Sequence, residues 1–155
     1  MTLSRNILIL LAAAGSAAVL LGAFGFQFLG DLPPCKLCIW QRWPHGIAIA
    51  IGIIAMMLPG RVLPLLGALA ATTTAAIGVF HTGVERDWWE GPSSCTGSGP
   101  SLGSLSGGDL LATDGPRLVM CDVVSWEMLG LSMASWNALF SLVLVALWIS
   151  ALRRS

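Results

Sequence analysis

The sequence predicts an all-α membrane protein, a four-transmembrane-helix bundle with a long outward loop that contains a short interfacial helix. Composition is the first reason, because a mean hydropathy of +0.81, with 55% hydrophobic and 10% charged residues, indicates a chain that lies in lipid. The second reason is that four apolar runs are each long enough to cross a hydrocarbon core about 30 Å thick. The third is that the acidic residues all fall in two of the segments between these runs.

The predicted spans belong to a single integral membrane domain that covers residues 1–155. They are residues 7–29, 43–59, 62–84 and 128–152, and the outward loops are residues 30–42 and 85–127. The first run also resembles a secretory signal, because Arg5 precedes an apolar stretch that contains small residues. We favour a membrane span, because the uncharged stretch is longer than the roughly 7–15 residues of a signal core.

Polar segments separate the spans. Two prolines at 33–34 end the first helix and present an extended chain. The turn at residues 59–61 is short, so the second and third spans form an antiparallel hairpin. Residues 91–108 are rich in Ser, Gly and Pro, which predicts a mobile loop. Residues 117–129 mix apolar side chains with a few charges, which predicts a short helix in the membrane interface. The alternative for this stretch is a collapsed loop that covers the bundle.

The charges orient the predicted bundle. One side of the membrane carries Arg5, Arg61, Arg153 and Arg154. Because Lys and Arg accumulate in short cytoplasmic segments, this side is expected to be the cytoplasm. All eight acidic residues fall in the two opposite segments. Both termini are therefore expected in the cytoplasm, and all four cysteines are expected to face a compartment in which disulfides persist.

Cys35 and Cys38 form a C-x-x-C pair directly before the second span. A position at a helix N-terminus stabilises an anion, lowers a cysteine pKa and makes thiolate available. Arg42 lies four residues after Cys38, so within a helix the two side chains project from the same face. The guanidinium is then close to the sulfur and stabilises the thiolate. The alternative is that Arg42 extends to the lipid headgroups.

Cys95 and Cys121 form a different kind of pair, far apart in one polar segment. Each lies in flexible sequence, and such a sulfur is open to attack by the thiolate of another protein. We therefore expect this pair to meet a soluble partner, while the C-x-x-C pair at the membrane meets a lipid-soluble electron acceptor. Four cysteines permit three pairings, and the resting connectivity stays open at this point.

Two structural uses of the cysteines are possible. Static disulfides would hold an extracellular loop, but a C-x-x-C closes a very short ring and contributes little loop-closure stabilisation. A zinc site is disfavoured, because the second pair lacks ligand spacing and the only histidines are His45 and His81. No metal site is predicted, and redox chemistry is the favoured use.

Two stretches resemble one known family. They are CKLCIWQR at residues 35–42 and CDVVSWEMLGLSMASWN at residues 121–137, together with the separate Cys95. This combination resembles the bacterial disulfide bond formation protein B family, DsbB, over nearly the whole chain. The resemblance implies a multi-pass protein of the bacterial inner membrane whose cysteines face the periplasm. It also implies a protein-dithiol:quinone oxidoreductase that reoxidises a DsbA-like thioredoxin-fold oxidase and reduces ubiquinone or menaquinone.

The resemblance implies a role for each cysteine. Cys95 would form the mixed disulfide with the partner and release Cys121 as a thiolate. Cys121 would then attack Cys35. Cys38 would be the sulfur beside the quinone, with its thiolate stabilised by Arg42.

Quinone reduction also consumes protons, so a polar group near the outer end of the third span would be useful. His81 and Glu85 lie one helical turn apart and can share a face. We name both as candidate quinone-binding residues, although this chain has Glu85 where the family pattern leads us to expect an amide. His45 is expected to have a structural role, either in helix capping or in packing, and not to react.

Three other functions stay open. A vitamin K epoxide reductase-like enzyme also joins loop cysteines, a C-x-x-C and a quinone, but in that family the loop pair comes first along the chain. A tetraspan structural protein would carry static loop disulfides. A dedicated relative would serve only a few secreted substrates. No nucleic-acid partner is predicted, and the sequence has no nucleotide-binding glycine motif.

Overall fold

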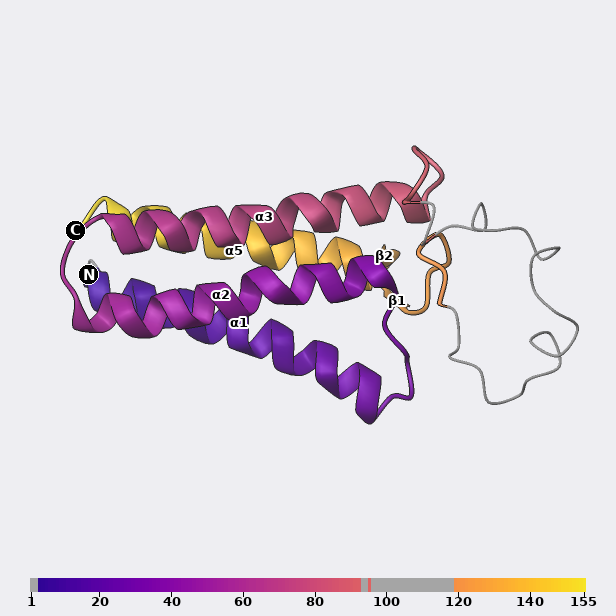
Figure 1. Ribbon diagram of the computed structural model, residues 1–155, viewed down its shortest axis with the longest axis horizontal. Helices are drawn as coiled ribbons and strands as arrows, with labels where there is room; N and C mark the ends of the chain where they lie inside the picture. Colours follow the sequence, from indigo (N-terminus) through magenta and orange to yellow (C-terminus); the bar gives the residue numbers. More distant parts are fainter. Residues whose placement is uncertain (1–2, 93–94, 96–118) are drawn as a thin grey trace, which may run out of the picture.

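The computed structural model describes residues 3–92, 95 and 119–155. This part of the chain forms four long helices and one small hairpin (Figure 1). The helices are α1 (Arg5–Phe28), α2 (Lys36–Met57), α3 (Val62–Glu85) and α5 (Met133–Leu152). The strands β1 (Glu127–Met128) and β2 (Leu131–Ser132) pair antiparallel directly before α5.

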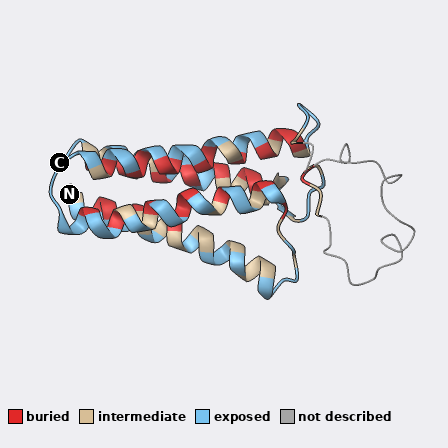
Figure 2. Cartoon of the chain, viewed as in Figure 1, coloured by how far each residue is buried: buried red, intermediate tan, exposed pale blue. Residues whose placement is uncertain are grey.

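The four helices form a bundle in which each helix packs against two neighbours. α1 contacts α2 and α5, and α3 contacts the same two helices. Both termini lie at one end of the bundle, beside the turn between α2 and α3 (Figure 1). Towards the opposite end α1 diverges from α2, and the buried residues gather on the faces that the helices turn toward one another (Figure 2).

Three helices are long and apolar enough to cross a membrane: α1, α3 and α5. They overlap the predicted spans at 7–29 and 62–84 and, with a later start, the span at 128–152. The last helix begins only at Met133 because the preceding residues form the β1–β2 hairpin. The span predicted at 43–59 lies within α2, which begins earlier, at Lys36, and includes the polar residues Gln41, Arg42 and His45. Because of these polar residues, α2 is less apolar than the other three helices and is not identified as a membrane span from its hydropathy.

The interfacial helix predicted at residues 117–129 is wrong for residues 119–129, which contain no helix. Leu129 and Gly130 both have positive φ, 56° and 75°, and make the tight turn of the β1–β2 hairpin. The stretch before it packs on the bundle, with the Trp126 ring 4.9 Å from the Phe26 ring. The alternative of a collapsed loop fits these residues. Residues 117–118, and most of the loop predicted to be mobile at 91–108, lie outside the described residues.

The apolar core lies in the half of the bundle that contains the termini. Its centre is Trp148, which is fully buried on α5 and packs against small side chains of the other helices. A Cβ atom built on Gly67 of α3 would lie 2.5 Å from the Trp148 ring. Only a glycine therefore lets α3 approach the indole this closely.

Arg5 ties the same end of the bundle together. Its guanidinium donates hydrogen bonds to the carbonyl oxygens of Ala55 at 3.0 Å and of Leu58 and Gly60 at 3.2 Å each. Its Nε atom donates to the hydroxyl of Ser155 at 3.0 Å. One arginine thus joins the start of α1, the α2–α3 turn and the C-terminus.

We predict that Gly67→Ala lowers the free energy of unfolding by about 1–3 kcal/mol, because the added methyl group overlaps the Trp148 ring. Gly46→Ala in α2 is the matched control, since a Cβ atom there meets nothing within 4 Å. This control is expected to leave stability unchanged or to raise it slightly, because alanine favours helix over glycine. Denaturant unfolding in detergent, followed by circular dichroism, measures both. Equal stability of the two variants would contradict the packing described here.

Candidate functional site

The C-x-x-C pair lies where α2 begins. Cys35 is the N-cap residue, and its sulfur accepts a hydrogen bond from the backbone N–H of Cys38 at 3.2 Å. Both are free cysteines, and their sulfur atoms lie 2.8 Å apart. The predicted position at a helix N-terminus is confirmed. The pKa of Cys35 is nevertheless raised, by its hydrogen bond with Cys38 and by burial.

Cys95 and Cys121 are joined by a disulfide bond. The backbone N–H of Cys121 also donates to the carbonyl oxygen of Cys95 at 2.7 Å. The prediction that this pair is open to attack is wrong for the described structure, because the two residues are only 2% and 0% exposed. They pack with Leu37 and Val84 in one apolar cluster at the end of the bundle opposite the termini. Neither sulfur is open to solvent in the described structure.

Both cysteine pairs converge on one histidine. Donor atoms of Cys35, His81 and Cys121 all lie within 4.8 Å of one another, and all three residues are buried. The Nε2 atom of His81 is 3.5 Å from the sulfur of Cys35. Zinc binds such donors, but the sulfur of Cys121 is bonded to Cys95 here and is not free to be a ligand. The geometry favours disulfide exchange between Cys121 and Cys35 instead.

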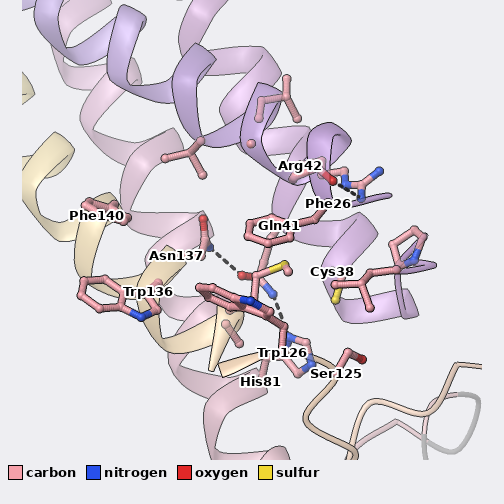
Figure 3. A pocket seen from close by; sticks show the side chains of 18 of the residues that line it. Phe26, Cys38, Gln41, Arg42, His81, Ser125, Trp126, Trp136, Asn137 and Phe140 are labelled. Atoms are coloured by element: carbon pink, nitrogen blue, oxygen red, sulfur yellow. Dashed lines mark hydrogen bonds between the residues drawn. The ribbon is translucent and has the colours of Figure 1, made fainter. Parts of the chain in front are cut away.

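A cavity of about 500 Å³ opens beside the C-x-x-C pair (Figure 3). Most of its wall is apolar and comes from α1, α5 and residues 120–128. Cys38 and Arg42 lie on this wall, and His81 and Glu85 also line it. Trp126 contributes a side chain from the loop segment that covers the bundle. The cavity thus brings a reactive thiol and an apolar binding space together.

Arg42 faces α1 across the edge of this cavity. Its guanidinium donates to Gln27 Oε1 at 2.6 Å and to the carbonyl oxygen of Ala23 at 3.5 Å, and it lies 4.9 Å from the centre of the Phe24 ring. Arg42 and Cys38 both line the cavity, as their spacing predicts. The side chain is held by α1, which disfavours the alternative that it extends to lipid headgroups.

His81 and Glu85 share a face of α3, as their spacing predicts. Their side chains are buried, with His81 Nε2 3.8 Å from Glu85 Oε1. The carboxylate of Glu85 accepts a hydrogen bond from the hydroxyl of Ser132, which in turn lies 3.1 Å from the hydroxyl of Ser135. Glu85 is therefore tied to the start of α5 rather than left free to reach into the cavity.

Gln41, Thr74 and Asn137 are polar residues of the site that we did not identify from the sequence. Their side chains join α2, α3 and α5: Asn137 Nδ2 donates to Thr74 Oγ1 at 3.2 Å, and Thr74 Oγ1 donates to the carbonyl oxygen of Gln41 at 3.1 Å. Polar side chains inside apolar spans are costly and usually functional. Thr74 and Asn137 lie within the third and fourth predicted spans, and this was the signal that could have found them. Gln41 lies two residues before the second predicted span and carried no such signal.

Residues 5–151 match the family described as Disulfide bond formation protein DsbB. The chain belongs to the DsbB family. Among curated relatives, Disulfide bond formation protein B of Dechloromonas aromatica is 34% identical over 131 residues, which cover 77% of this chain and 75% of the relative. Disulfide bond formation protein B of Shewanella sp. (strain MR-4) is 33% identical over 147 residues and covers 88% of this chain and 82% of the relative. No solved structure matches the chain.

Membership of the DsbB family agrees with the chemistry of the site. The predicted resemblance is confirmed over almost the whole chain. Together with the apolar helices, it makes this chain an integral inner-membrane oxidoreductase that forms disulfides. The two converging cysteine pairs are the groups in the described residues that can perform this chemistry.

We predict that a variant of this DsbB-family chain with Cys38→Ser and Cys95→Ser forms a Cys35–Cys121 disulfide under mild oxidation. The reason is that these two sulfur atoms lie within 4.8 Å of each other. A matched control with Cys35→Ser and Cys95→Ser retains Cys38 and Cys121 and is expected to cross-link several-fold more slowly. Mass spectrometry of proteolytic fragments measures both products. Faster cross-linking of the control would contradict the described geometry.

Proposed function

We propose that this DsbB-family chain oxidises the dithiol of a periplasmic, DsbA-like thioredoxin-fold oxidase and transfers the electrons to a membrane quinone. The observation that carries the proposal is the position of Cys35. Its sulfur lies within 4.8 Å of Cys121 on one side and 2.8 Å from Cys38 on the other, and Cys38 lines the apolar cavity. Electrons can therefore pass from the loop pair to the cavity through sulfur atoms alone.

The proposal includes α2 as the fourth membrane span. α2 has 22 residues and is therefore about 33 Å long, which matches the hydrocarbon core. Its polar side chains Gln41 and His45 are buried in the bundle and do not face lipid. Four spans keep both termini on one side, and the arginines at that end favour the cytoplasm. The cysteines then face the periplasm.

The proposed relay begins with the partner. A thiolate of the partner attacks Cys95, which forms a mixed disulfide and releases Cys121 as a thiolate. Cys121 attacks Cys35, which forms a Cys35–Cys121 disulfide and releases Cys38 as a thiolate. Each step makes one sulfur–sulfur bond, breaks another and leaves the electron pair on the departing sulfur.

The relay then closes. The second thiol of the partner displaces Cys95, so the partner leaves in its oxidised form. Cys95 attacks Cys121 and restores the loop disulfide, and Cys35 departs as a thiolate. The two thiolates of Cys35 and Cys38 then give up two electrons and form their disulfide again. The quinone takes up these electrons together with two protons, equal in number to those that the partner's two thiols released, and becomes the quinol. The described arrangement, a loop disulfide beside two free cysteines, corresponds to the stage just before this last transfer.

The cavity supports a quinone as the second substrate. An apolar wall and a volume of about 500 Å³ suit a ring with an isoprenoid chain, and ubiquinone and menaquinone are equal candidates. Arg42 lines the same cavity as Cys38 and is proposed to supply the positive charge that stabilises its thiolate. His81 and Glu85 are proposed to face the quinone less directly, since His81 contacts Gln41 and Cys35 and Glu85 accepts a hydrogen bond from Ser132.

Quinone reduction by the purified protein, in the presence of a reduced thioredoxin-fold oxidase, tests the proposal and is followed by absorbance. We expect Cys38→Ser to abolish turnover, because the chain loses the sulfur that lines the cavity. We expect Arg42→Ala to raise the KM for quinone by about tenfold, as for the loss of a hydrogen bond to a charged group. Arg61→Ala removes an arginine at the opposite end and is expected to change turnover by less than about twofold.

A folded native chain that turns over neither ubiquinone nor menaquinone would reject the proposal. Cysteines that stay oxidised in cells with a reduced quinone pool would favour static disulfides instead. Thiol alkylation in such cells measures this directly, because relay cysteines accumulate as free thiols when no acceptor is available.

A further inference from the structure

Hydrogen bonds connect Cys35 to His45 through three helices. From Cys35 the chain passes to His81 on α3, whose Nδ1 atom lies 3.0 Å from Nε2 of Gln41 on α2. From Gln41 it passes to Asn137 on α5, whose Nδ2 atom donates to Gln41 Oε1 at 2.6 Å. It ends at His45 on α2, whose Nε2 atom is 2.9 Å from Asn137 Oδ1. Figure 3 shows its middle part, in which Gln41 lies between Asn137 and His81.

One backbone carbonyl sets the direction of this chain. Gln41 Nε2 lies 3.2 Å from the carbonyl oxygen of Leu37, which can only accept. The amide nitrogen of Gln41 therefore points to this side, and the same nitrogen donates to Nδ1 of His81. An Nδ1 atom that accepts carries no proton in the neutral ring, so the proton of His81 is on Nε2. It faces the sulfur of Cys35 at 3.5 Å, with Glu85 Oε1 3.8 Å from the same nitrogen and the backbone of Cys121 as a further hydrogen-bond partner of the ring.

The directions of the remaining hydrogen bonds, from Gln41 to His45, follow from the same assignment. With its nitrogen turned to His81, Gln41 presents its oxygen to Asn137, whose amide nitrogen must donate. The oxygen of Asn137 then faces His45 and accepts from Nε2–H. Every bond in the chain thus has a donor and an acceptor in the same sense, from His45 toward Cys35.

We propose that this chain of hydrogen bonds holds His81 in a single tautomer, with the Nε2 proton directed at the sulfur of Cys35 during disulfide exchange. The positioning residues are Gln41, Asn137 and His45. His81 is a catalytic residue in this step, because it touches the reacting sulfur. The inference rests on the proposed relay and assigns a specific role to His81 in it.

The step concerned is the departure of Cys35. As Cys95 attacks Cys121, the bond between Cys95 and Cys121 forms and the bond between Cys121 and Cys35 breaks. The electron pair stays on the sulfur of Cys35, and no proton is transferred. Cys35 is only 4% exposed, so water stabilises the departing thiolate poorly. The Nε2–H group of His81 supplies a second hydrogen bond at 3.5 Å, beside the one from the backbone N–H of Cys38.

Burial makes a fixed tautomer necessary. His81 is 3% exposed, Gln41 6% and His45 2%, so none of them can exchange partners with bulk water. Without Gln41 the ring of His81 could place its proton on Nδ1, and Nε2 would then present a lone pair to the thiolate. That arrangement repels the departing sulfur.

The protein has two histidines, His45 and His81, so the NMR signals of both rings can be followed directly. In protein labelled with ¹⁵N-histidine and kept in detergent, ring nitrogen shifts report the tautomer. We expect protonated Nε2 and bare Nδ1 for both rings of the parent protein. We expect Gln41→Leu to shift the Nδ1 and Nε2 signals of His81 toward a mixture of tautomers. His45→Leu, which also identifies the signals, is expected to shift them less.

Turnover gives the second measurement. We expect His45→Leu and Gln41→Leu to lower kcat by about two- to tenfold, as for the loss of one hydrogen bond. His45→Gln keeps a donor at this position and is expected to restore most of the rate. Thr73→Val is the control, since Thr73 is exposed and bonds only to its own helix at the carbonyl oxygen of Leu69.

A His81 ring that carries its proton on Nδ1 in the parent protein would overturn the inference. Signals of His81 that do not change in Gln41→Leu would overturn it as well. The spectra require neither quinone nor partner protein, so they answer this question even if the proposed relay fails. A parent protein without quinone turnover but with the expected spectra would reject the relay and leave the tautomer assignment intact.

Discussion

The rest of the site depends on the hydrogen bond between Gln41 and His81. In an apolar bundle an unpaired polar side chain is costly, because no bulk water is available to replace a lost partner. This bond joins α2 to α3 and links the sulfur cluster to the interior of the bundle. It lets two buried histidines lie among apolar helices with defined hydrogen-bond directions.

The two ends of the bundle have different physical roles. Around Trp148 the helices pack through small residues, and Arg5 closes this end by binding three carbonyl groups. At the other end α1 diverges, and the space is lined by thiol, guanidinium and apolar groups instead. The rigid end keeps the helices aligned, so the reactive end can contain a cavity without loss of the fold.

Three apolar helices and the position of a thiol at a helix N-terminus could be predicted from the sequence, because hydropathy and the position of the C-x-x-C pair indicate them directly. The sequence was insufficient for residues 119–129, where a disulfide at Cys121, a ring contact at Trp126 and a turn at Gly130 override local helical preference. The polar network was missed for a similar reason: which amide meets which histidine depends on helix rotation, and periodicity in one chain does not fix rotation between helices.

The loop segment that follows the disulfide also forms part of the cavity wall. Cys121 is bonded to Cys95, and five residues later Trp126 packs on Phe26 of the diverging helix α1. Movement of the Cys121 sulfur is therefore mechanically coupled to the shape of the cavity. Thermodynamic reciprocity then applies: if a bound molecule changes the ease of disulfide exchange, the redox state of the loop changes the affinity for that molecule by the same factor.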